Sequence, residues 1–515
     1  MKDVRILIVD DEKKWLDSLE QVLLRRLNPD IKIERAKSYP EALVKVQSTS
    51  YDLVSMDLEL LGESSSPTKF NLSGMELLKE CRSSKRNRAC GLMILSGKAT
   101  AKAVSEALKT FGINEFLDKL DYDDGMPYVK AAQSSIRSAR LQQAQRRFDN
   151  RYQLTFTYDQ HSLLRGDLVG PAQGSENAEI ISPPPIDIED LARRADEVNQ
   201  RLNCGDEGLW RLEARSIGEA IYRTISSQQK IFSLLATAQA LALNRADGTL
   251  SLQFSGPPSS LSVPYELMRE AGDYLALTHI LTRRLLQGSP RVSHKSDSFF
   301  RFIEKLVEAG DPLRILIAGA NSDGNVPAVE EEASQLAASI ESNLQLLGIT
   351  SEVTPLLGDN VTYKKLSEAL HDGQHIFHFA GHGNFDESVP EKSPLSLIDR
   401  ELTAADLKLL TQETELRFVF LSCCLSARTG SRVGRGDFHG LLHALSLADV
   451  PAALAYRWEV RDDSAIELAT EFYDSLWRNF CPGQALLESR REIALGAEGR
   501  DNETWAAPVL LSQTI

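Results

Sequence analysis

Residues 4–11 read VRILIVDD, a nearly continuous apolar run that ends in two aspartates. Three similar runs follow at 51–56, 91–95 and 114–118, and helix-length segments separate them. Runs that are apolar on both faces and alternate with helical segments are typical of a parallel sheet in an α/β domain. The sequence therefore predicts an α/β domain at the N-terminus.

The composition of the whole chain predicts a folded protein of several domains. Its 515 residues correspond to three or four domains at about 100–200 residues each. Hydrophobic residues make up 42% and charged residues 25%, which argues against disorder, and the net charge of −15 argues against a nucleic-acid or membrane-surface partner. No apolar run reaches the roughly 18 residues that would span a bilayer. The start shows no signal-peptide layout and the six cysteines include no CxxC pair, so we expect a cytoplasmic protein.

Changes in composition divide the chain into four segments. The first is the α/β domain at 1–140, and we expect a helical connector and a Pro/Gly/Ser-rich linker over 141–185. The segment 186–300 shows helical and strand-like stretches, and a second α/β alternation covers 310–515, with runs at 314–319, 375–379, 417–421 and 452–456. A basic helix is predicted over 126–150, and its arginines are expected on a solvated face: Arg137, Arg140, Arg146 and Arg147.

Polar residues end each of the four N-terminal runs. Asp10 and Asp11 end the first, and Asp57, Ser96 and Lys119 end the others. The carboxyl ends of parallel strands meet at one edge of a sheet, so these side chains should converge. Paired carboxylates suit a hard cation such as Mg²⁺, and an aspartate can accept a phosphoryl group whose oxygens a lysine and a hydroxyl would bind. One such acid alone would usually be a solvated loop residue, but four matching strand ends make that interpretation improbable.

These residues and their spacing resemble the receiver domain of two-component response regulators over residues 1–140. The resemblance implies a flavodoxin-like, doubly wound fold with Asp57 as phospho-acceptor, and a sensor histidine kinase or other phosphodonor as partner. It further implies a Mg²⁺ site and a phosphorylation switch, the first made by Asp10, Asp11, Asp57 and the carbonyl of Glu59, the second by Ser96, Phe116 and Lys119.

Two features depart from the receiver pattern. Leu120 follows Lys119 where the family usually has a proline in a cis bond. The loop after Asp57 is long and runs through residues 62–67 before the usual continuation, so we interpret it as a solvated insertion beside the phosphorylation site.

A histidine and a cysteine pair follow two of the later runs. The first run leads into His382 and Gly383, and the second leads into Cys423 and Cys424. Peptide cleavage by cysteine needs a thiolate, a base that forms it and donors for the oxyanion, and a glycine lets backbone N–H groups approach. Either residue alone would usually be structural. Adjacent strand residues face opposite ways, so only one of the two cysteines can face the sheet edge, and residue type does not choose between them.

The surrounding sequence resembles the CHAT family, clan-mates of caspases and separases, from about residue 205 to 515. The segments that carry the resemblance are SVPYEL at 262–267, FHFAGHGNFD at 377–386, FLSCCLS at 420–426, WEVRD at 458–462, FY at 472–473 and AL at 485–486. It implies a two-lobed caspase-like module, with a degenerate lobe at 186–300 and a catalytic lobe at 310–515. It also implies a Cys424–His382 dyad, an oxyanion hole at Gly383 and Cys424, and no cofactor for the dyad.

The leading hypothesis is a bacterial cysteine endopeptidase that cleaves protein substrates under the control of receiver phosphorylation. The alternative is a signalling scaffold whose receiver and protease-like lobes bind partners without cutting. A transcription factor is disfavoured by the acidic charge and by the lack of a helix-turn-helix pattern, and a phosphate-relay module by the length. A homo-oligomer is compatible with the sequence. The caspase QACxG signature is absent, so the resemblance does not imply cleavage after aspartate.

Overall fold

The computed structural model divides the chain into two compact units. One unit comprises Met1–Gln145, Glu341–Thr350 and Trp477–Asn479, and the other comprises the remaining residues. The structure describes residues 4–60, 73–97, 101–158, 164–171, 175–178, 194, 207–245, 248–257, 261, 263–286, 295, 297–322, 324, 328–384, 386, 389–423, 440–458, 460–496 and 503–513. The expected insertion at 62–67 and Cys424 therefore lie outside the described residues.

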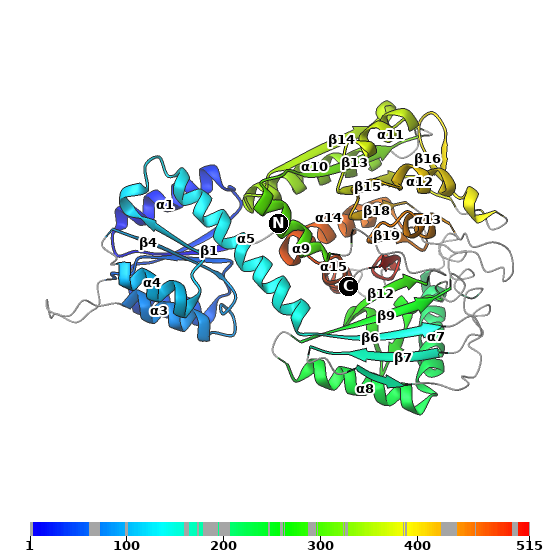
Figure 1. Cartoon of the computed structure of the whole chain (residues 1–515), viewed down its shortest axis with the longest axis horizontal. Coiled ribbons are helices and arrows are strands. Elements are labelled where there is room, and N and C mark those ends of the chain that lie inside the picture. Colours follow the sequence, from blue (N-terminus) through cyan, green and yellow to red (C-terminus); the bar gives the residue numbers. More distant parts are fainter. Residues whose placement is uncertain are drawn as a thin grey trace. The chain divides into compact units, whose positions relative to one another are not determined.

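The first unit contains a five-stranded parallel sheet with the strand order β2-β1-β3-β4-β5 (Figure 1). This is the order of flavodoxin-like folds, which confirms the predicted fold class. The four apolar runs all form strands, and one further strand was not predicted. The strand bounds are β1 Arg5–Val9, β2 Lys32–Ala36, β3 Leu53–Met56, β4 Gly91–Ser96 and β5 Glu115–Asp118.

Helices cover both faces of this sheet, with α1 on one side and α3 and α4 on the other (Figure 1). The helix bounds are α1 Lys13–Arg26, α2 Tyr39–Ser48, α3 Ser73–Ser83, α4 Ala101–Phe111 and α5 Met126–Asp149. In α1, Leu16, Leu19 and Leu23 are buried at helical spacing, which presents one apolar stripe to the sheet. The central strands β1, β3 and β4 are buried on both faces, so their polar groups gather at the strand ends.

The arginines of α5 differ from the prediction of a solvated face. Arg140 is 5% exposed, and its guanidinium contacts the Asp52 carboxylate at 2.7 Å. Arg137 donates hydrogen bonds to the carbonyl oxygens of Leu347 and Gly348, all within this unit. The prediction was wrong for these two residues because a basic side chain can satisfy buried acceptors, which composition alone does not reveal.

The second unit contains one continuous eleven-stranded sheet, ordered β14-β13-β15-β18-β19-β20-β12-β9-β6-β7-β8. The four later runs of the sequence form β13 Leu313–Ala320, β15 Ile376–Gly381, β18 Phe418–Ser422 and β19 Ala452–Tyr456, all parallel to one another. β20 then pairs antiparallel to β19 and carries the sheet on to β12. The other strands are β6 Arg151–Tyr158, β7 Leu164–Val169, β8 Ser175–Ala178, β9 Thr249–Gly256, β12 Ile280–Leu285, β14 Ser351–Leu357 and β20 Pro508–Ser512.

Part of the expected connector over 141–185 belongs to this sheet. β6 pairs with both β7 and β9, and β7 pairs with β8, so three strands occupy residues predicted as helix and linker. The prediction of a connector is wrong for these residues. Turn-forming residues between short strands gave the region its linker-like composition.

Helices flank the large sheet, and Figure 1 shows α7 and α8 beside the strands β6, β7, β9 and β12. Two short antiparallel ribbons complete the unit, β10 with β11 and β16 with β17. The helix bounds are α7 Glu207–Ser226, α8 Gln229–Leu243, α9 Phe299–Ala309, α10 Ala328–Leu346, α11 Tyr363–His371, α12 Ala404–Thr411, α13 Leu441–Leu447, α14 Asp462–Asn479 and α15 Pro482–Leu495. The ribbon bounds are β10 Arg269–Glu270, β11 Asp273–Tyr274, β16 Pro394–Ser396 and β17 Glu401–Thr403.

Residues 263–267 of the motif SVPYEL are buried against this sheet. Glu266 forms an ion pair with Arg283 of β12, and both side chains are almost fully buried. The Arg283 guanidinium lies over the Tyr265 ring, which stacks on Phe254 of β9. Removing either charge would leave the other buried without a partner, so the motif has a structural role.

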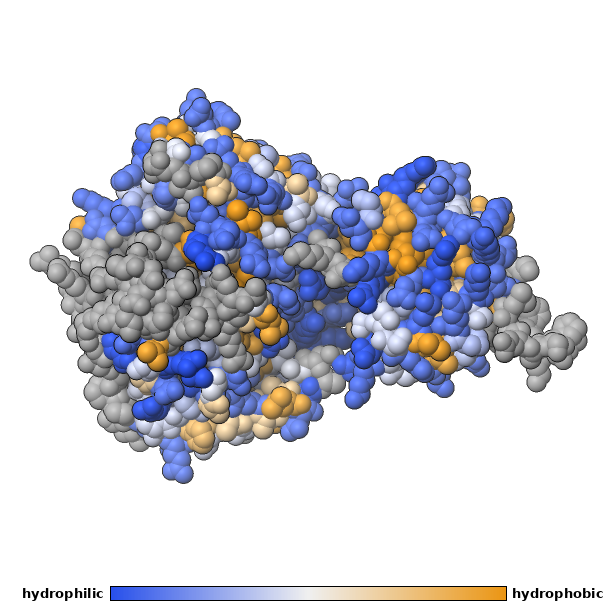
Figure 2. Space-filling model, turned by 180° about the vertical axis from the view of Figure 1, so that it is seen from behind, coloured by the Kyte–Doolittle hydropathy of each residue, from blue (hydrophilic) through white to orange (hydrophobic). Residues whose placement is uncertain are grey.

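Apolar side chains on the surface form small, separate groups. Figure 2 shows these groups among larger hydrophilic areas on the face drawn there. Among the described residues, no helix is long and apolar enough to cross a bilayer. Scattered apolar exposure of this kind is normal for a folded protein and does not by itself mark a binding surface on that face.

Candidate functional site

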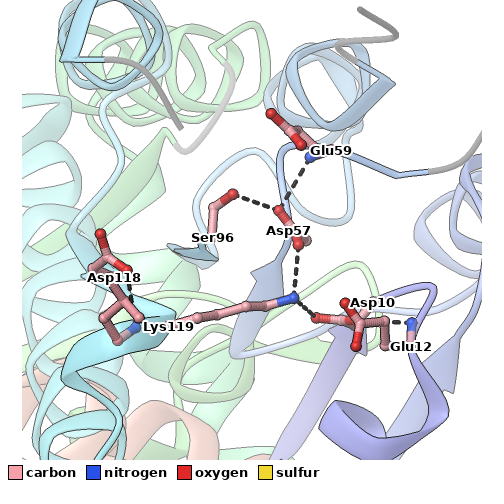
Figure 3. A network of polar contacts seen from close by, with 8 residues as sticks. Asp10, Glu12, Asp57, Glu59, Ser96, Asp118 and Lys119 are labelled. Carbon is pink, nitrogen blue, oxygen red and sulfur yellow. Dashed lines mark hydrogen bonds and ion pairs between the residues drawn. The ribbon is translucent and has the colours of Figure 1, made fainter. Parts of the chain in front are cut away.

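The predicted pocket of the first unit assembles at the carboxyl edge of its sheet. Asp10 follows β1, Asp57 follows β3, Ser96 ends β4 and Lys119 follows β5. The Lys119 ammonium lies 2.7 Å from the Asp10 carboxylate and 2.8 Å from the Asp57 carboxylate (Figure 3). The Ser96 hydroxyl donates a 2.6 Å hydrogen bond to Asp57 Oδ1. Side chains from four strand ends therefore meet around one carboxylate, as the sequence predicted.

Backbone groups hold the two aspartates in place. The amide of Glu12 donates to Asp10 Oδ1 at 2.9 Å, and the amide of Glu59 donates to Asp57 Oδ1 at 3.1 Å. The start of α3 presses on the same loop, because a β-carbon on Gly74 would lie 2.6 Å from the Cα of Leu58. Only glycine permits this approach, which explains its place in the sequence after Asp57.

Burial and charge act against each other in this pocket. Burial raises the pKa of the Asp10 carboxyl, and the bonds to Lys119 and the Glu12 amide only partly oppose that shift. Burial alone would lower the pKa of Lys119, but hydrogen bonds and charges from Asp10 and Asp57 raise it overall. The Lys119 ammonium also lies 5.1 Å from the centre of the Trp15 ring. The lysine is therefore kept charged beside the phospho-acceptor candidate.

The carboxylates of the pocket fit a hard divalent cation. Ligand oxygens of Asp10, Asp11 and Asp57 all lie within 4.8 Å of one another. Three carboxylate oxygens at this spacing suit Mg²⁺, which prefers oxygen ligands and binds through carboxylates together with phosphate. The Glu59 backbone adjoins the pocket through its hydrogen bond to Asp57, and its carbonyl remains a predicted fourth ligand.

Leu120 follows Lys119 at the position where receiver domains usually have a proline. The described residues contain no cis peptide bond. The Leu120 amide donates a 2.9 Å hydrogen bond to Asp118 Oδ1, which a proline could not do (Figure 3). The predicted switch aromatic, Phe116, is partly buried against the core cluster of this unit. Its role in switching remains a prediction.

In the second unit, a short antiparallel pairing fixes His382 beyond the end of β15. The His382 carbonyl accepts a 3.0 Å hydrogen bond from the Ser396 amide, and Gly383 bridges to Leu395. The His382 side chain is half-buried. Its backbone is thus anchored at the carboxyl edge of the sheet, where the sequence placed the base.

Of the two cysteines that follow β18 in the sequence, the structure describes only Cys423. Cys423 directly follows β18 and is 2% exposed. Buried thiols of this kind are usually packing residues. Cys424 lies outside the described residues, so its distance to His382 remains untested.

A buried polar network that the sequence did not reveal lies on the Ser422 face. Glu332 Oε1 lies 3.2 Å from His378 Nε2 and 2.7 Å from Ser422 Oγ, and Tyr473 Oη lies 3.4 Å from His378 Nδ1. Glu332 comes from α10, 46 residues before His378. No local sequence pattern connects Glu332 to these residues, because it reaches them from a separate helix.

Comparisons with known proteins define the class of each part. A family model described as the response regulator receiver domain matches residues 6–125, and one described as the CHAT domain matches residues 217–513. The CHAT match covers more than half of the chain, so the chain belongs to the CHAT domain family. It carries a receiver domain ahead of that domain, which confirms the two resemblances drawn from the sequence.

Several solved structures similar to this chain are receiver proteins, and three of them align with a quarter of it. A CheY-like receiver from Methanospirillum hungatei has 25% identity over 25% of this chain and 90% of its own, with a TM-score of 0.20. The response regulator TrrA of Thermotoga maritima, in complex with Mg²⁺ and BeF, has 30% identity over 25% of this chain and 97% of its own, with a TM-score of 0.19. CheY4 of Vibrio cholerae has 19% identity over 25% and 98%, with a TM-score of 0.20. No curated protein matches the chain.

The joined domains support a protein regulated by phosphorylation, and a receiver domain implies a phosphodonor such as a histidine kinase. CHAT domains are a caspase-like family. The chemistry of the individual residues is a proposal.

Proposed function

We propose that this protein is a cysteine endopeptidase controlled by phosphorylation of Asp57. Membership of the caspase-like CHAT family supports the enzyme class. The observation that carries the proposal is the anchoring of half-buried His382 at the carboxyl end of β15, next to the strand β18 that leads into Cys424. The proposed domains are a receiver at 1–140, a degenerate lobe at 186–300 and a catalytic lobe at 310–515, and the strands β6, β7 and β8 extend the large sheet.

In the proposed reaction, His382 takes the proton of the Cys424 thiol and the thiolate attacks the peptide carbonyl. A C–S bond forms, and the oxyanion is stabilised by backbone N–H groups at Gly383 and Cys424. Collapse of this intermediate breaks the peptide C–N bond, and His382 passes its proton to the leaving amine. Water then hydrolyses the thioester and frees the second product. The burial of the Cys423 side chain supports Cys424 as the nucleophile.

In the proposed control step, an Asp57 oxygen attacks the phosphoryl group of a phosphohistidine, the P–N bond breaks and an acyl phosphate forms. Lys119 and Ser96 already lie within 3 Å of the Asp57 oxygens and would bind phosphoryl oxygens. A Mg²⁺ ion held by Asp10, Asp11 and Asp57 would neutralise negative charge on the phosphoryl group.

The test is a map of new N-termini in a bacterial lysate treated with the protein or with its Cys424→Ala variant. Each is tested with and without Mg²⁺ and beryllofluoride, which mimics phosphate on aspartate. We expect cuts that vanish in Cys424→Ala, depend on beryllofluoride and lose that dependence in Asp57→Ala. Cuts that persist in Cys424→Ala would refute the assignment of the nucleophile. No cuts in any condition would favour the scaffold that binds partners without cleaving.

A further inference from the structure

Three side chains surround the Lys119 ammonium in the described part of the acidic pocket. Two are the carboxylates of Asp10 and Asp57, at 2.7 Å and 2.8 Å (Figure 3). The third is the indole ring of Trp15, whose centre lies 5.1 Å from the Lys119 nitrogen. An ammonium group carries three N–H bonds. Two carboxylates and one aromatic face are therefore available to a lysine side chain that is only 10% exposed.

One face of α1 holds Trp15 in this position. Trp15, Ser18 and Val22 have the spacing i, i+3 and i+7, which places them on one side of the helix. The Tyr122 ring packs edge-on against Trp15 with 5.2 Å between the ring centres, and its hydroxyl forms a 2.9 Å hydrogen bond with Ser18 Oγ. Gly125, at a φ of +82°, fits against the same face, because a β-carbon there would lie 2.7 Å from Val22 Cγ2. The segment that follows β5 is thus packed on α1, and it fixes the indole from the outer side.

The three contacts of the lysine differ in their fate when the pocket changes state. Asp10 is a candidate ligand of Mg²⁺, and the metal would compete with the lysine for that carboxylate. The lysine contacts Asp57 at Oδ2, and phosphorylation of this aspartate would change the contact. The indole of Trp15 ligates no hard cation and accepts no phosphoryl group. Its contact with the ammonium is therefore compatible with every state of the two carboxylates.

We propose that Trp15 is a positioning residue of the receiver: its ring keeps the Lys119 ammonium beside Asp57 while the carboxylates exchange their partners, so that the lysine is in place to bind the incoming phosphoryl group. This inference rests on the proposed phosphorylation of Asp57 and adds a residue to that same site. The ring quadrupole attracts a cation on the face of the indole, and an apolar side chain without a ring does not.

The test measures phosphorylation of the full-length protein by phosphoramidate, a small phosphodonor, in the presence of Mg²⁺. An Asp57 oxygen attacks the phosphorus atom, the P–N bond breaks and ammonia leaves, and intact-mass spectrometry gives the initial rate of acyl-phosphate formation. Trp15→Leu removes the ring and keeps an apolar side chain, whereas Trp15→Phe keeps an aromatic face. The matched control is Tyr39→Leu, the same kind of change at a partly buried aromatic residue of α2.

A second measurement separates positioning of the lysine from support of the loop that carries Asp10 and Asp11. Calorimetric titration with Mg²⁺ alone, without a phosphodonor, reports whether the carboxylates of this loop still form their site. A change that acts only through Lys119 slows phosphoryl transfer and leaves the affinity for Mg²⁺ nearly unchanged. A change that disorders the start of α1 lowers both.

We expect Trp15→Leu to lower the phosphorylation rate about 5- to 30-fold, the range of a partly desolvated cation–π contact. Trp15→Phe should stay within about threefold of wild type, and Tyr39→Leu should match wild type. All of these variants should bind Mg²⁺ within about threefold of the wild-type affinity. Trp15→Met also lacks a ring and should behave as Trp15→Leu does, so it replaces that variant if leucine prevents folding.

Three results would overturn the inference alone. A leucine variant that is phosphorylated as fast as wild type would mean that the ring does not act on the lysine. A phenylalanine variant as slow as the leucine variant would assign the effect to the size of the side chain. An equal loss of Mg²⁺ affinity in Trp15→Leu would make Trp15 a structural residue of the loop. The proposed phosphorylation fails separately, and this inference with it, if wild type gains no phosphoryl group or Asp57→Ala gains one equally fast.

Discussion

The residue that introduces β15 makes the second unit sensitive to acid. The Nδ1 atom of His375 accepts a 3.1 Å hydrogen bond from the Arg314 amide, which requires that nitrogen to be unprotonated. Burial, together with the charge of Arg314, lowers the pKa of His375 to about 4, against 6.5 for an ordinary histidine. Between pH 4 and pH 6.5, the His375 side chain therefore binds a proton in the unfolded chain but not in the folded protein. Stability contributed by this group is therefore present above pH 6.5 and is lost as the pH falls toward 4.

The magnitude follows from the two pKa values. One pKa unit corresponds to 1.36 kcal/mol, so full linkage between pH 7 and pH 5 gives about 2 kcal/mol. The ring is only half-buried, and screening by water reduces this to about 1–2 kcal/mol. We expect His375→Asn to remove this part of the pH dependence, because the asparagine oxygen can accept the Arg314 bond and does not titrate.

The assay is urea unfolding at pH 7 and pH 5, followed by tryptophan fluorescence in a Trp15→Phe background. Four tryptophans remain, and two of them, Trp458 and Trp505, are buried in the second unit and report its unfolding. The difference between the two free energies of unfolding should shrink by about 1–2 kcal/mol in His375→Asn and stay unchanged in the exposed control His371→Asn. An equal difference in wild type and His375→Asn would refute the reasoning.

Three further predictions concern contacts elsewhere in the two units. For a typical coupling, beryllofluoride should change the cleavage rate about 5- to 150-fold. Lys119→Met should reduce that change to less than about twofold, because Asp57 loses its ammonium partner. Cleavage rates measured with and without beryllofluoride test this. Arg283→Met should cost about 3–5 kcal/mol in urea unfolding by leaving the Glu266 carboxyl buried and unpaired, and adding Glu266→Leu should recover most of it. Gly319→Ala should lower the stability of the second unit by about 1–3 kcal/mol in thermal unfolding, because its new methyl group collides with a carbonyl of α10.

Most of the strands that the sequence predicted are buried on both faces, and the edge strand β5 is the exception in the first unit. β1, β3 and β4 read as unbroken apolar runs because helices cover them on either side. β2 and β14 lie at the edges of their sheets and carry polar residues such as Lys32 and Glu352. A search for continuous apolar runs therefore does not predict them. The continuation of the large sheet through β20 and β12 depends on pairing between distant segments, which no local pattern encodes.

The sequence predicted the acidic pocket but not the buried network around Glu332, and the reason is similar. Each residue of the acidic pocket ends a strand of one sheet, so strand order alone brings Asp10, Asp57 and Lys119 together. Glu332 reaches its partners from a helix, 90 residues before Ser422 in the chain. Its place depends on how closely α10 packs on β13, a tertiary property that the sequence pattern does not show.

The resting contacts of Asp57 indicate how a phosphoryl group could act as a switch. Oδ1 accepts hydrogen bonds from Ser96 and the Glu59 amide, and Oδ2 binds Lys119. A phosphoryl group on either oxygen must break the contacts made there, and its own oxygens would take over the freed donors. Each hydrogen bond to a charged group is worth about 1.5–3 kcal/mol, and the coupling free energy of a typical allosteric protein is about 1–3 kcal/mol. Exchanging one contact at the end of β4 or β5 is therefore enough to supply the coupling, and no larger rearrangement of the pocket is required.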